Sequence, residues 1–209
     1  MKVESVNIAQ ASDTPWGRSA CPKRPVQNRL TMGSTGLEGD EHVDSDHTGP
    51  YFACTAYAAE DLEWWAGQLG TELAPGAFGE NFTLRGIDVR EMLIGQFWYL
   101  GTIRFEVMGP VLPSAAFAAW TGQEDWVGRF AEAARPGVYL RPIVWKGGGD
   151  VASGDSCEIV WTPQDGVTIR ESWLACAGDA DVLRRILDVP GRSPAWDALA
   201  GHLLGASAG

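Results

Sequence analysis

Three glycine-punctuated segments in the first half of the chain carry side chains suited to acid–base chemistry. They are 36–40 (GLEGD), 47–49 (HTG) and 76–83 (GAFGENFT). Glycine is typical of positions where the backbone takes a positive φ or passes close to a ligand. The polar residues on these segments are Glu38, Asp40, His47, Glu80 and Asn81. Because carboxylates, an imidazole and an amide on loops are what a reaction site needs, these segments predict a polar active site.

Glu80 is the first candidate for a general base. It lies between Phe78 and Phe82 in the sequence, and an apolar environment raises the pKa of a carboxyl group, so that it can exchange protons near neutral pH. Alternatively, its carboxylate accepts backbone N–H bonds and holds the turn. His47 and Asp40 are the expected proton-handling or orienting partners, although Asp40 could also cap a turn and His47 could simply pair with a nearby aspartate.

Residues around these segments are expected to bind the substrate. Lys23 and Arg24 could hold a carboxylate or phosphate, although a solvated pair is the simpler interpretation. Aromatic side chains at Tyr51, Phe52 and Phe78 would form a wall for a flat ring. The full expected substrate-binding set is Glu38, Tyr51, Phe52, Phe78, Asn81, Ser114, Lys23, Arg24 and Arg141. We expect no metal site, because no second histidine lies at ligand spacing from His47.

The hydrophobic pattern predicts a mainly β protein with flanking helices. Strands are expected at 3–8, 26–32, 97–100, 102–108, 138–145, 156–161 and 167–170. The strands at 138–145 and 156–161 are expected on either side of a glycine-rich turn. Helices are expected at 55–69, 123–134, 179–188 and 193–204, and Gly70 is placed to cap the first. Segments 10–25 and 33–50 are expected to be loops. Many short strands joined by glycine turns predict a barrel or sandwich over 1–164, followed by a small helical appendage over 165–209.

Composition narrows the class of protein. A chain of 209 residues with a formal net charge of −11 disfavours binding to nucleic acid and to anionic membranes, and mildly favours cationic ligands such as amines. No apolar run is long enough for a membrane span, and no secretory signal is visible. Four scattered cysteines without a C-x-x-C pair indicate reduced thiols in a cytoplasmic protein. The sequence does not predict an oligomeric state.

Taken together, these segments make the chain resemble the MOSC family, named for the C-terminal domain of molybdenum-cofactor sulfurase. The resemblance rests on segments 23–26 (KRPV), 36–40, 47–49, 76–83, 94–95 (IG) and 137–141 (GVYLR). It implies a β-barrel with a flanking helix and a polar cleft formed by these loops, and 161–204 is similar to the helical tail of small stand-alone bacterial members. Family members are associated with molybdenum cofactor, with sulfur transfer and with reduction of N-hydroxylated compounds.

The chain departs from the family at 110–114 (PVLPS). Where the family has a cysteine after a Pro-Arg-x-Pro run, Ser114 and Val111 replace the cysteine and the arginine. Persulfide carriage and Mo–S ligation need a thiolate, and the arginine would clamp a phosphate. We therefore expect a site without a cofactor. Binding of molybdenum cofactor is the alternative, and it would require Cys21 or Cys54 to supply the thiolate.

The leading hypothesis is thus a repurposed MOSC-like enzyme that performs acid–base chemistry on a small organic molecule. One concrete reaction is condensation and cyclisation of an aromatic amine with a carbonyl compound, a Pictet–Spengler type of step in secondary metabolism. It needs an acid for imine formation and a base when the ring rearomatises. The alternatives are the ordinary family role with molybdenum cofactor and a small-molecule-binding module without turnover.

Overall fold

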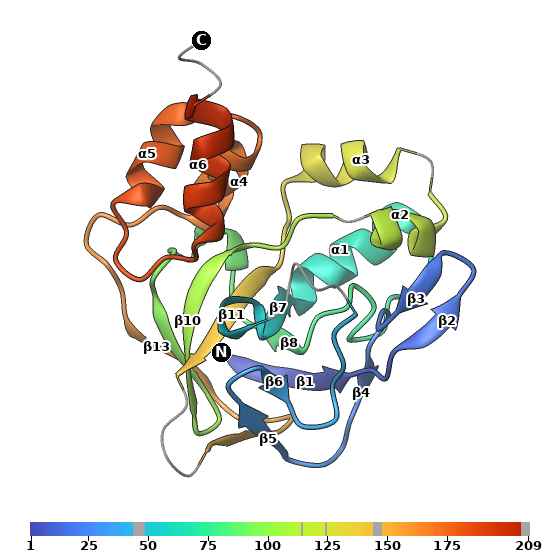
Figure 1. Cartoon of the computed structure of the whole chain (residues 1–209). Helices are drawn as coiled ribbons and strands as arrows, with labels where there is room; N and C mark the ends of the chain where they lie inside the picture. The colour runs from blue at the N-terminus through green and yellow to red at the C-terminus, as the bar shows by residue number, and fades with distance from the viewer. Residues whose placement is uncertain (44–48, 114, 124, 144–147, 206–209) are drawn as a thin grey trace.

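A curled β-sheet forms the centre of the molecule (Figure 1). The structure is a computed structural model that describes residues 1–43, 49–113, 115–123, 125–143 and 148–205. Within these residues, eight strands form one mixed sheet in the order β13-β9-β10-β11-β7-β8-β1-β4. All neighbouring strands are antiparallel except β7 and β8, which are parallel. The predicted mainly β fold is confirmed, as a half-barrel with helices packed around it.

The elements have the following bounds. The strands are β1 (Lys2–Ile8), β2 (Ser12–Thr14), β3 (Gly17–Ser19), β4 (Arg24–Pro25), β5 (Leu30–Gly33), β6 (Gly36–Leu37), β7 (Cys54–Ala58), β8 (Phe82–Arg85), β9 (Phe97–Leu100), β10 (Ile103–Pro110), β11 (Val138–Ile143), β12 (Asp150–Val151) and β13 (Cys157–Trp161). The helices are η2 (Pro50–Phe52), α1 (Ala59–Leu69), η3 (Val89–Glu91), α2 (Ala115–Thr121), α3 (Trp126–Ala133), α4 (Ile169–Cys176), α5 (Ala180–Leu187) and α6 (Ala195–Gly205).

Strand β7 corrects the first predicted helix. The helical pattern at 55–69 begins as a strand, and α1 starts only at Ala59. Because β7 lies inside the sheet between β11 and β8, its residues are held by pairing on both sides, which overrides the helix propensity of its alanines. The parallel pair β7 and β8 needs a crossover, and α1 supplies it. Gly70 ends α1 in the left-handed conformation, with φ of 63°, as predicted.

Long-range pairing also changes the other strand predictions. The strands predicted on either side of the glycine-rich turn are β11 and β13. In the described structure they do not pair with each other. Strand β11 pairs with β10 and β7, and β13 pairs with β9. Strand β12 lies at the end of that turn and pairs with β5. Of the strand predicted at 26–32, the structure forms β5 at Leu30–Gly33. The predicted loop at 10–25 contains the hairpin β2–β3 and the short β4, and the loop at 33–50 contains β6.

The tail begins with a helix where the sequence prediction has a strand. Thr168 caps α4, since its hydroxyl accepts the N–H of Glu171 at 3.0 Å and the Glu171 carboxylate accepts the N–H of Thr168 at 2.9 Å. This capping box is a helix-start signal that the alternation of Val167 and Ile169 obscured. Helix α2 was not predicted, whereas α3, α5 and α6 fall close to the predicted positions.

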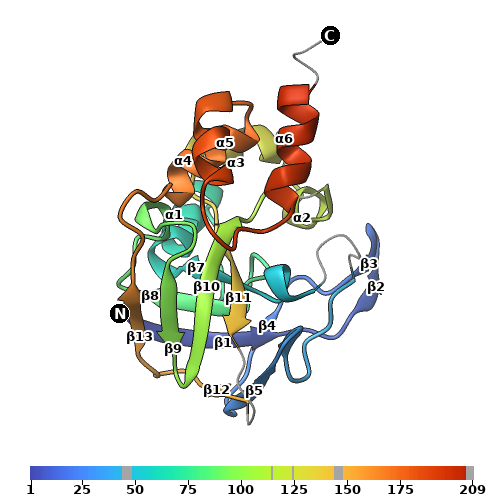
Figure 2. The same cartoon turned by 60° about the vertical axis from the view of Figure 1, so that its left-hand side comes forward.

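The C-terminal helices share the core of the sheet. Figure 2 shows α4, α5 and α6 gathered at one end of strands β9 and β10. Trp196 of α6 is buried, and its indole N–H donates to the carbonyl of Met108 at 3.0 Å. A Cβ atom at Gly109 would lie 2.9 Å from the Trp196 ring, so this close approach requires glycine. The boundary at residue 164 therefore marks a change in secondary structure, and one hydrophobic core continues across it.

None of the helices in the described ranges is long and apolar enough to cross a membrane.

The Trp196 contact predicts coupled unfolding of sheet and tail. We expect Trp196→Ala to lower the free energy of unfolding by about 3–5 kcal/mol, because it leaves a cavity in the shared core. Urea unfolding followed by circular dichroism and by fluorescence should show one transition. Trp161→Ala, at a half-exposed tryptophan, is the matched control and should cost much less. A separate early transition of the tail in Trp196→Ala would contradict the shared core.

Candidate functional site

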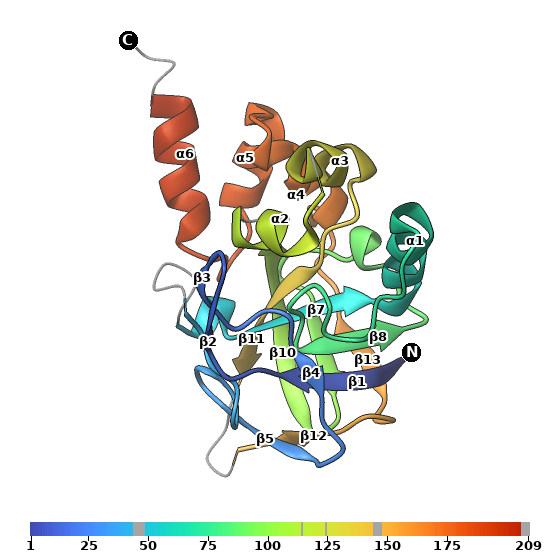
Figure 3. The same cartoon turned by 90° about the vertical axis from the view of Figure 1, so that its right-hand side faces the viewer.

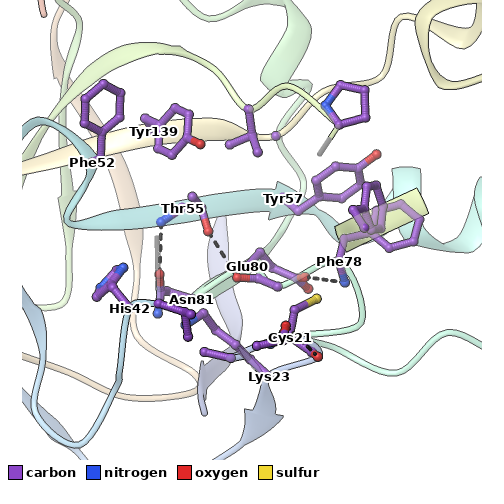
Figure 4. Close-up of a pocket in the computed structure, with 18 of the residues that line it drawn as sticks. Cys21, Lys23, His42, Phe52, Thr55, Tyr57, Phe78, Glu80, Asn81 and Tyr139 are labelled. Carbon is purple, nitrogen blue, oxygen red and sulfur yellow. Dashed lines mark hydrogen bonds between the residues drawn. The ribbon is translucent and has the colours of Figure 1, made fainter. Parts of the chain in front are cut away.

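A cavity of about 550 Å³ opens beside strand β7 (Figure 4). Its wall is built by the hairpin β2–β3, the loop that precedes β8 and the segment that follows β10. Figure 3 shows the hairpin on the same side of the molecule as α2. The volume is typical of small-molecule sites. Its aromatic lining is Phe52, Tyr57, Phe78, Phe117, Phe130 and Tyr139, and its polar lining includes Arg18, Ser19, Cys21, Lys23, Glu41, His42, Thr55, Glu80 and Asn81.

The aromatic wall is rigid because its rings pack on one another. The Phe78 ring makes edge contacts with Tyr57 and Phe117, at centroid separations of 5.2 and 4.8 Å. Behind them, Trp65 stacks on Phe130 at 5.5 Å with nearly parallel rings. Such contacts add to the burial of each ring. The cavity therefore presents a preformed apolar surface suited to a flat ligand.

A buried ion pair lies at the polar side of the cavity. Lys23 Nζ lies 2.5 Å from Asp40 Oδ1 and 2.7 Å from Oδ2, and the two side chains are 7% and 0% exposed. Asp40 also accepts the N–H of Ala9 at 2.9 Å and the amide of Asn81 at 2.8 Å. Four hydrogen bonds use the acceptor capacity of a carboxylate. The acceptor positions of the Asp40 carboxylate are thus all in use.

Asn81 connects this pair to the sheet. Its side-chain oxygen accepts the N–H of Thr55 on β7 at 3.1 Å, and its amide nitrogen donates to the carbonyl of Asn7 on β1 at 3.3 Å as well as to Asp40. The buried amide therefore has partners for both of its ends, as buried polar groups require. Asn81, Asp40 and Lys23 therefore lie together in the folded chain.

Glu80 is held by its own loop. Its carboxylate accepts the N–H of Gly76 at 2.7 Å, the N–H of Phe78 at 3.1 Å and the hydroxyl of Thr83 at 2.8 Å. Burial raises the pKa of Glu80, and these hydrogen bonds oppose the rise. A Cβ atom at Gly76 would lie 2.6 Å from the Lys23 carbonyl, so only glycine lets this turn close. The contacts favour the turn-holding interpretation of Glu80, and its catalytic role stays a prediction.

His42 is a candidate that sequence reasoning missed. Its Nε2 lies 3.7 Å from Asp40 Oδ2, and its side chain is 26% exposed. Burial lowers the pKa of His42 below its ordinary value of 6.5; Asp40 opposes this shift and Lys23 adds to it. The imidazole is therefore neutral at neutral pH and can accept a proton. The spacing Asp40-x-His42 was visible in the sequence, but nothing local placed this histidine beside the carboxylate.

A second cavity of about 370 Å³ adjoins the first. Two residues, His42 and Phe52, line both cavities. The remaining lining residues of the smaller cavity are Thr35, Gly36, Leu37, Asp40 and Gly49.

The other predicted site residues are placed as follows. Four of them line the larger cavity, namely Phe52, Phe78, Lys23 and Asn81. Four others are absent from the described lining of both cavities: Glu38, Tyr51, Arg24 and Arg141. Arg141 instead forms an ion pair with Glu106, and its guanidinium carbon lies 5.0 Å from the centre of the Tyr51 ring. The charge of Arg141 thus joins η2 to the sheet. Glu38 and Arg24 are exposed. His47 and Ser114 lie outside the described residues.

A family model described as the MOSC domain matches residues 44–158. The chain belongs to the MOSC domain family. The match spans more than half of the chain and includes the loop before β8 and the segment after β10 that line the larger cavity. The predicted resemblance is confirmed.

Relatives of this MOSC chain cover most of its length. It is 27% identical over 180 residues to the uncharacterized protein YflK of Bacillus subtilis (strain 168), covering 84% of this chain and 80% of that protein. It is 28% identical over 192 residues to the protein YiiM of Escherichia coli (strain K12), covering 87% and 83%. The crystal structure of YiiM from Geobacillus stearothermophilus superposes with a TM-score of 0.79 at 21% identity, covering 97% and 98%, and supports the fold.

The contacts of Glu80 predict a structural cost. We expect Glu80→Gln to lower the free energy of unfolding by about 1–3 kcal/mol. The carboxylate accepts hydrogen bonds from three donors through two oxygen atoms, whereas the amide of glutamine has one oxygen. Some of the three donors would therefore lose their partner. Thermal and urea unfolding measure the change. Glu38→Gln makes the same replacement at an exposed loop position and should leave stability unchanged. If the two variants had equal free energies of unfolding, Glu80 would not hold the turn.

Proposed function

We propose that this MOSC-family chain is an enzyme that performs acid–base chemistry on a small organic molecule bound in the larger cavity. The observation that carries the proposal is the place of the His42 imidazole in the cavity lining, 3.7 Å from a buried and fully hydrogen-bonded carboxylate. Burial lowers the pKa of His42, which favours the neutral form that accepts a proton. His42 replaces Glu80 as our choice of base, because Glu80 is occupied by its loop.

Asp40 would act on the imidazole through its charge. The separation of 3.7 Å between His42 Nε2 and Asp40 Oδ2 is longer than a hydrogen bond, and the carboxylate already accepts four hydrogen bonds. When the imidazole takes a proton, the nearby carboxylate favours the charged form. Lys23 lines the same cavity, but its ammonium group is paired with Asp40. The described site thus supplies a proton acceptor.

The apolar wall and the charge of the protein favour an aromatic amine as the substrate. A flat ring fits the surface formed by Phe78 and its aromatic neighbours, and the net charge of −11 favours approach of a cation. The specific reaction that we propose is condensation and cyclisation with a carbonyl compound, of the Pictet–Spengler type. His42 would remove the proton from the ring carbon as aromaticity returns. The step is redox-neutral and requires no electron carrier.

The described lining fits molybdenum cofactor poorly. Cys21 is the cysteine in the described cavity wall, and burial, together with the Glu80 carboxylate, raises the pKa of its thiol to about 11. Cys54 is fully buried, and burial raises the pKa of its thiol as well. Among the described cations of the lining, Lys23 is paired with Asp40, and Arg18 Nη1 lies 3.9 Å from Asp13 Oδ1. These residues therefore offer no accessible thiolate, and the proposed reaction does not use the cofactor.

The proposal predicts loss of turnover in His42→Gln. Tryptamine with acetaldehyde is the first substrate pair to test, followed by other aromatic amines and aldehydes. Chiral chromatography with mass spectrometry separates an enzymatic product, which has one configuration in excess, from the racemic background. We expect His42→Gln to reduce turnover about 10²–10⁴-fold, while His202→Gln, at an exposed position of α6, retains it. Full turnover in His42→Gln, or no enantiomeric excess with any pair, would refute the assignment.

The pH profile is a further consequence of the same imidazole. Because the pKa of His42 lies below 6.5, the base is neutral at neutral pH and becomes protonated only in acid. We expect kcat/KM to be flat through neutral pH and to fall as the pH decreases through that lowered pKa. An acid limb centred above 6.5 would show that a different group controls the reaction.

Elemental analysis separates the proposal from the ordinary family role. Purified protein from a host that makes molybdenum cofactor should contain far less than one molybdenum atom per chain by mass spectrometry, and the denatured protein should release no pterin fluorescence. A value near one molybdenum per chain would overturn the proposal and direct attention to Cys21.

A further inference from the structure

Two charged side chains in the described lining of the larger cavity have capacity left for a ligand. Lys23 is paired with Asp40, and the carboxylate of Glu80 holds its own loop. The other acidic and basic side chains of this lining, apart from the imidazole, are Arg18 and Glu41. The described cavity wall therefore offers a charged ligand one guanidinium and one carboxylate.

Glu41 is anchored through one oxygen of its carboxylate. Its Oε2 accepts the N–H of Ala11 at 2.8 Å, and its backbone N–H donates to the carbonyl of Ala9 at 2.9 Å. These bonds hold the side chain in place, and within the described residues they leave Oε1 without a donor. Because both oxygens of an ionised carboxylate accept hydrogen bonds, Oε1 is placed to accept the N–H of a ligand's ammonium group.

Arg18 is held by a weak contact. Its Nη1 lies 3.9 Å from Asp13 Oδ1, which is longer than a hydrogen bond, and the two side chains are 59% and 92% exposed. An ion pair between such exposed side chains contributes little to stability, so the guanidinium can leave it at small cost. Its planar N–H donors match the two oxygens of a carboxylate.

Both groups lie beside the first strand of the β2–β3 hairpin. Arg18 of β3 is opposite Asp13 of β2, and Glu41 is bonded to Ala11, two residues before Asp13. Two residues of extended chain span about 7 Å, and the long side chain of arginine covers most of such a distance. The guanidinium and the carboxylate are therefore within reach of a single ligand that carries two opposite charges.

We infer that the larger cavity binds an aromatic α-amino acid. The ring packs against the aromatic wall around Phe78, the ammonium group donates to Glu41, and the carboxylate accepts hydrogen bonds from Arg18. The inference rests on the proposed function and deepens it, because it names the class of amine that the cavity selects. The amine is an amino acid with an aromatic side chain in place of a simple aromatic amine.

The two charged residues select against ligands with a single charge. A simple amine leaves the Arg18 guanidinium without an acceptor on the ligand, and a simple aromatic acid leaves Glu41 without a donor. An amino acid supplies the opposite charge to each residue and has no net charge, so the overall charge of −11 does not repel it. Because specificity is a difference between affinities, it should depend on both residues.

Three indole compounds with different charges test the site. L-Tryptophan carries an ammonium and a carboxylate, tryptamine carries the ammonium alone, and 3-indolepropionate carries the carboxylate alone. Isothermal titration calorimetry with the full-length protein at neutral pH measures each affinity. We expect L-tryptophan to bind about 5-fold more tightly than either analogue, which is the upper range for one ion pair near the surface. Equal affinities, or failure of L-tryptophan to bind, would overturn the inference.

Two variants assign the ends of the ligand. Arg18→Gln should weaken binding of L-tryptophan and 3-indolepropionate about 5-fold and leave tryptamine unchanged. Glu41→Gln should weaken L-tryptophan and tryptamine to the same degree and leave 3-indolepropionate unchanged. Glutamine keeps an oxygen that can accept the N–H of Ala11, so the anchor of the side chain is preserved. A variant that weakens all three ligands equally, or none of them, would refute the assignment of that residue.

Arg170→Gln and Glu158→Gln are the matched controls. Both positions are exposed and absent from the described lining of the larger cavity, and Arg170 has a surface ion pair of its own with Glu91 at 3.1 Å. Each control changes the net charge by the same amount as the variant it matches. Circular dichroism checks that all four variants are folded. The controls should leave the three affinities unchanged, and an equal loss in a control would show that overall charge, and not the site, causes the effect.

These outcomes are separate from the test of the proposed function. Binding of L-tryptophan that depends on both charges, without turnover with any carbonyl compound, would refute the acid–base reaction and leave the amino-acid site intact. Turnover that depends on His42, with equal kcat/KM for tryptamine and L-tryptophan, would support the reaction and refute the amino-acid site.

Discussion

The buried ion pair between Lys23 and Asp40 is the interaction on which the site depends. It ties the segment after the β2–β3 hairpin to the loop after β6, and through Asn81 it joins both to the sheet. Removing one member of such a pair typically costs about 3–5 kcal/mol, because the other charge is left buried without a partner. The pair also balances its own charge, so that a neutral His42 can lie beside it.

The family fold and the lining of the cavity are two separate features of this chain. The half-barrel is that of a MOSC protein, and Gly76 brings the loop before β8 against the Lys23 backbone. Within this frame the cavity wall is largely aromatic, and Val111 is part of its lining. Fold and site are thus separable: the backbone fixes where a ligand lies, and the side chains decide which ligand it is.

The helices contribute by holding the cavity wall in place. Helix α1 and helix α3 supply Trp65 and Phe130, whose stacked rings support the aromatic wall from behind. On the other side, Trp196 anchors the C-terminal helices to the strand that leads into the 111–113 segment. Because the wall is packed from both sides, a ligand meets a surface that is ordered before binding, and this lowers the entropic cost of association.

The sequence by itself determined the class of fold, the family, the hairpin of β9 and β10, the cap at Gly70 and the glycine loops that approach the cavity. These features depend on local conformation and on periodic burial, which a single chain displays directly. Tertiary structure alone decided that 54–58 is a strand and that β12 pairs with β5. It also decided that Glu80 is occupied by its turn while His42 faces both cavities. Strand pairing and side-chain neighbours depend on contacts between distant segments, and the number of residues between two groups does not fix the distance between them in space.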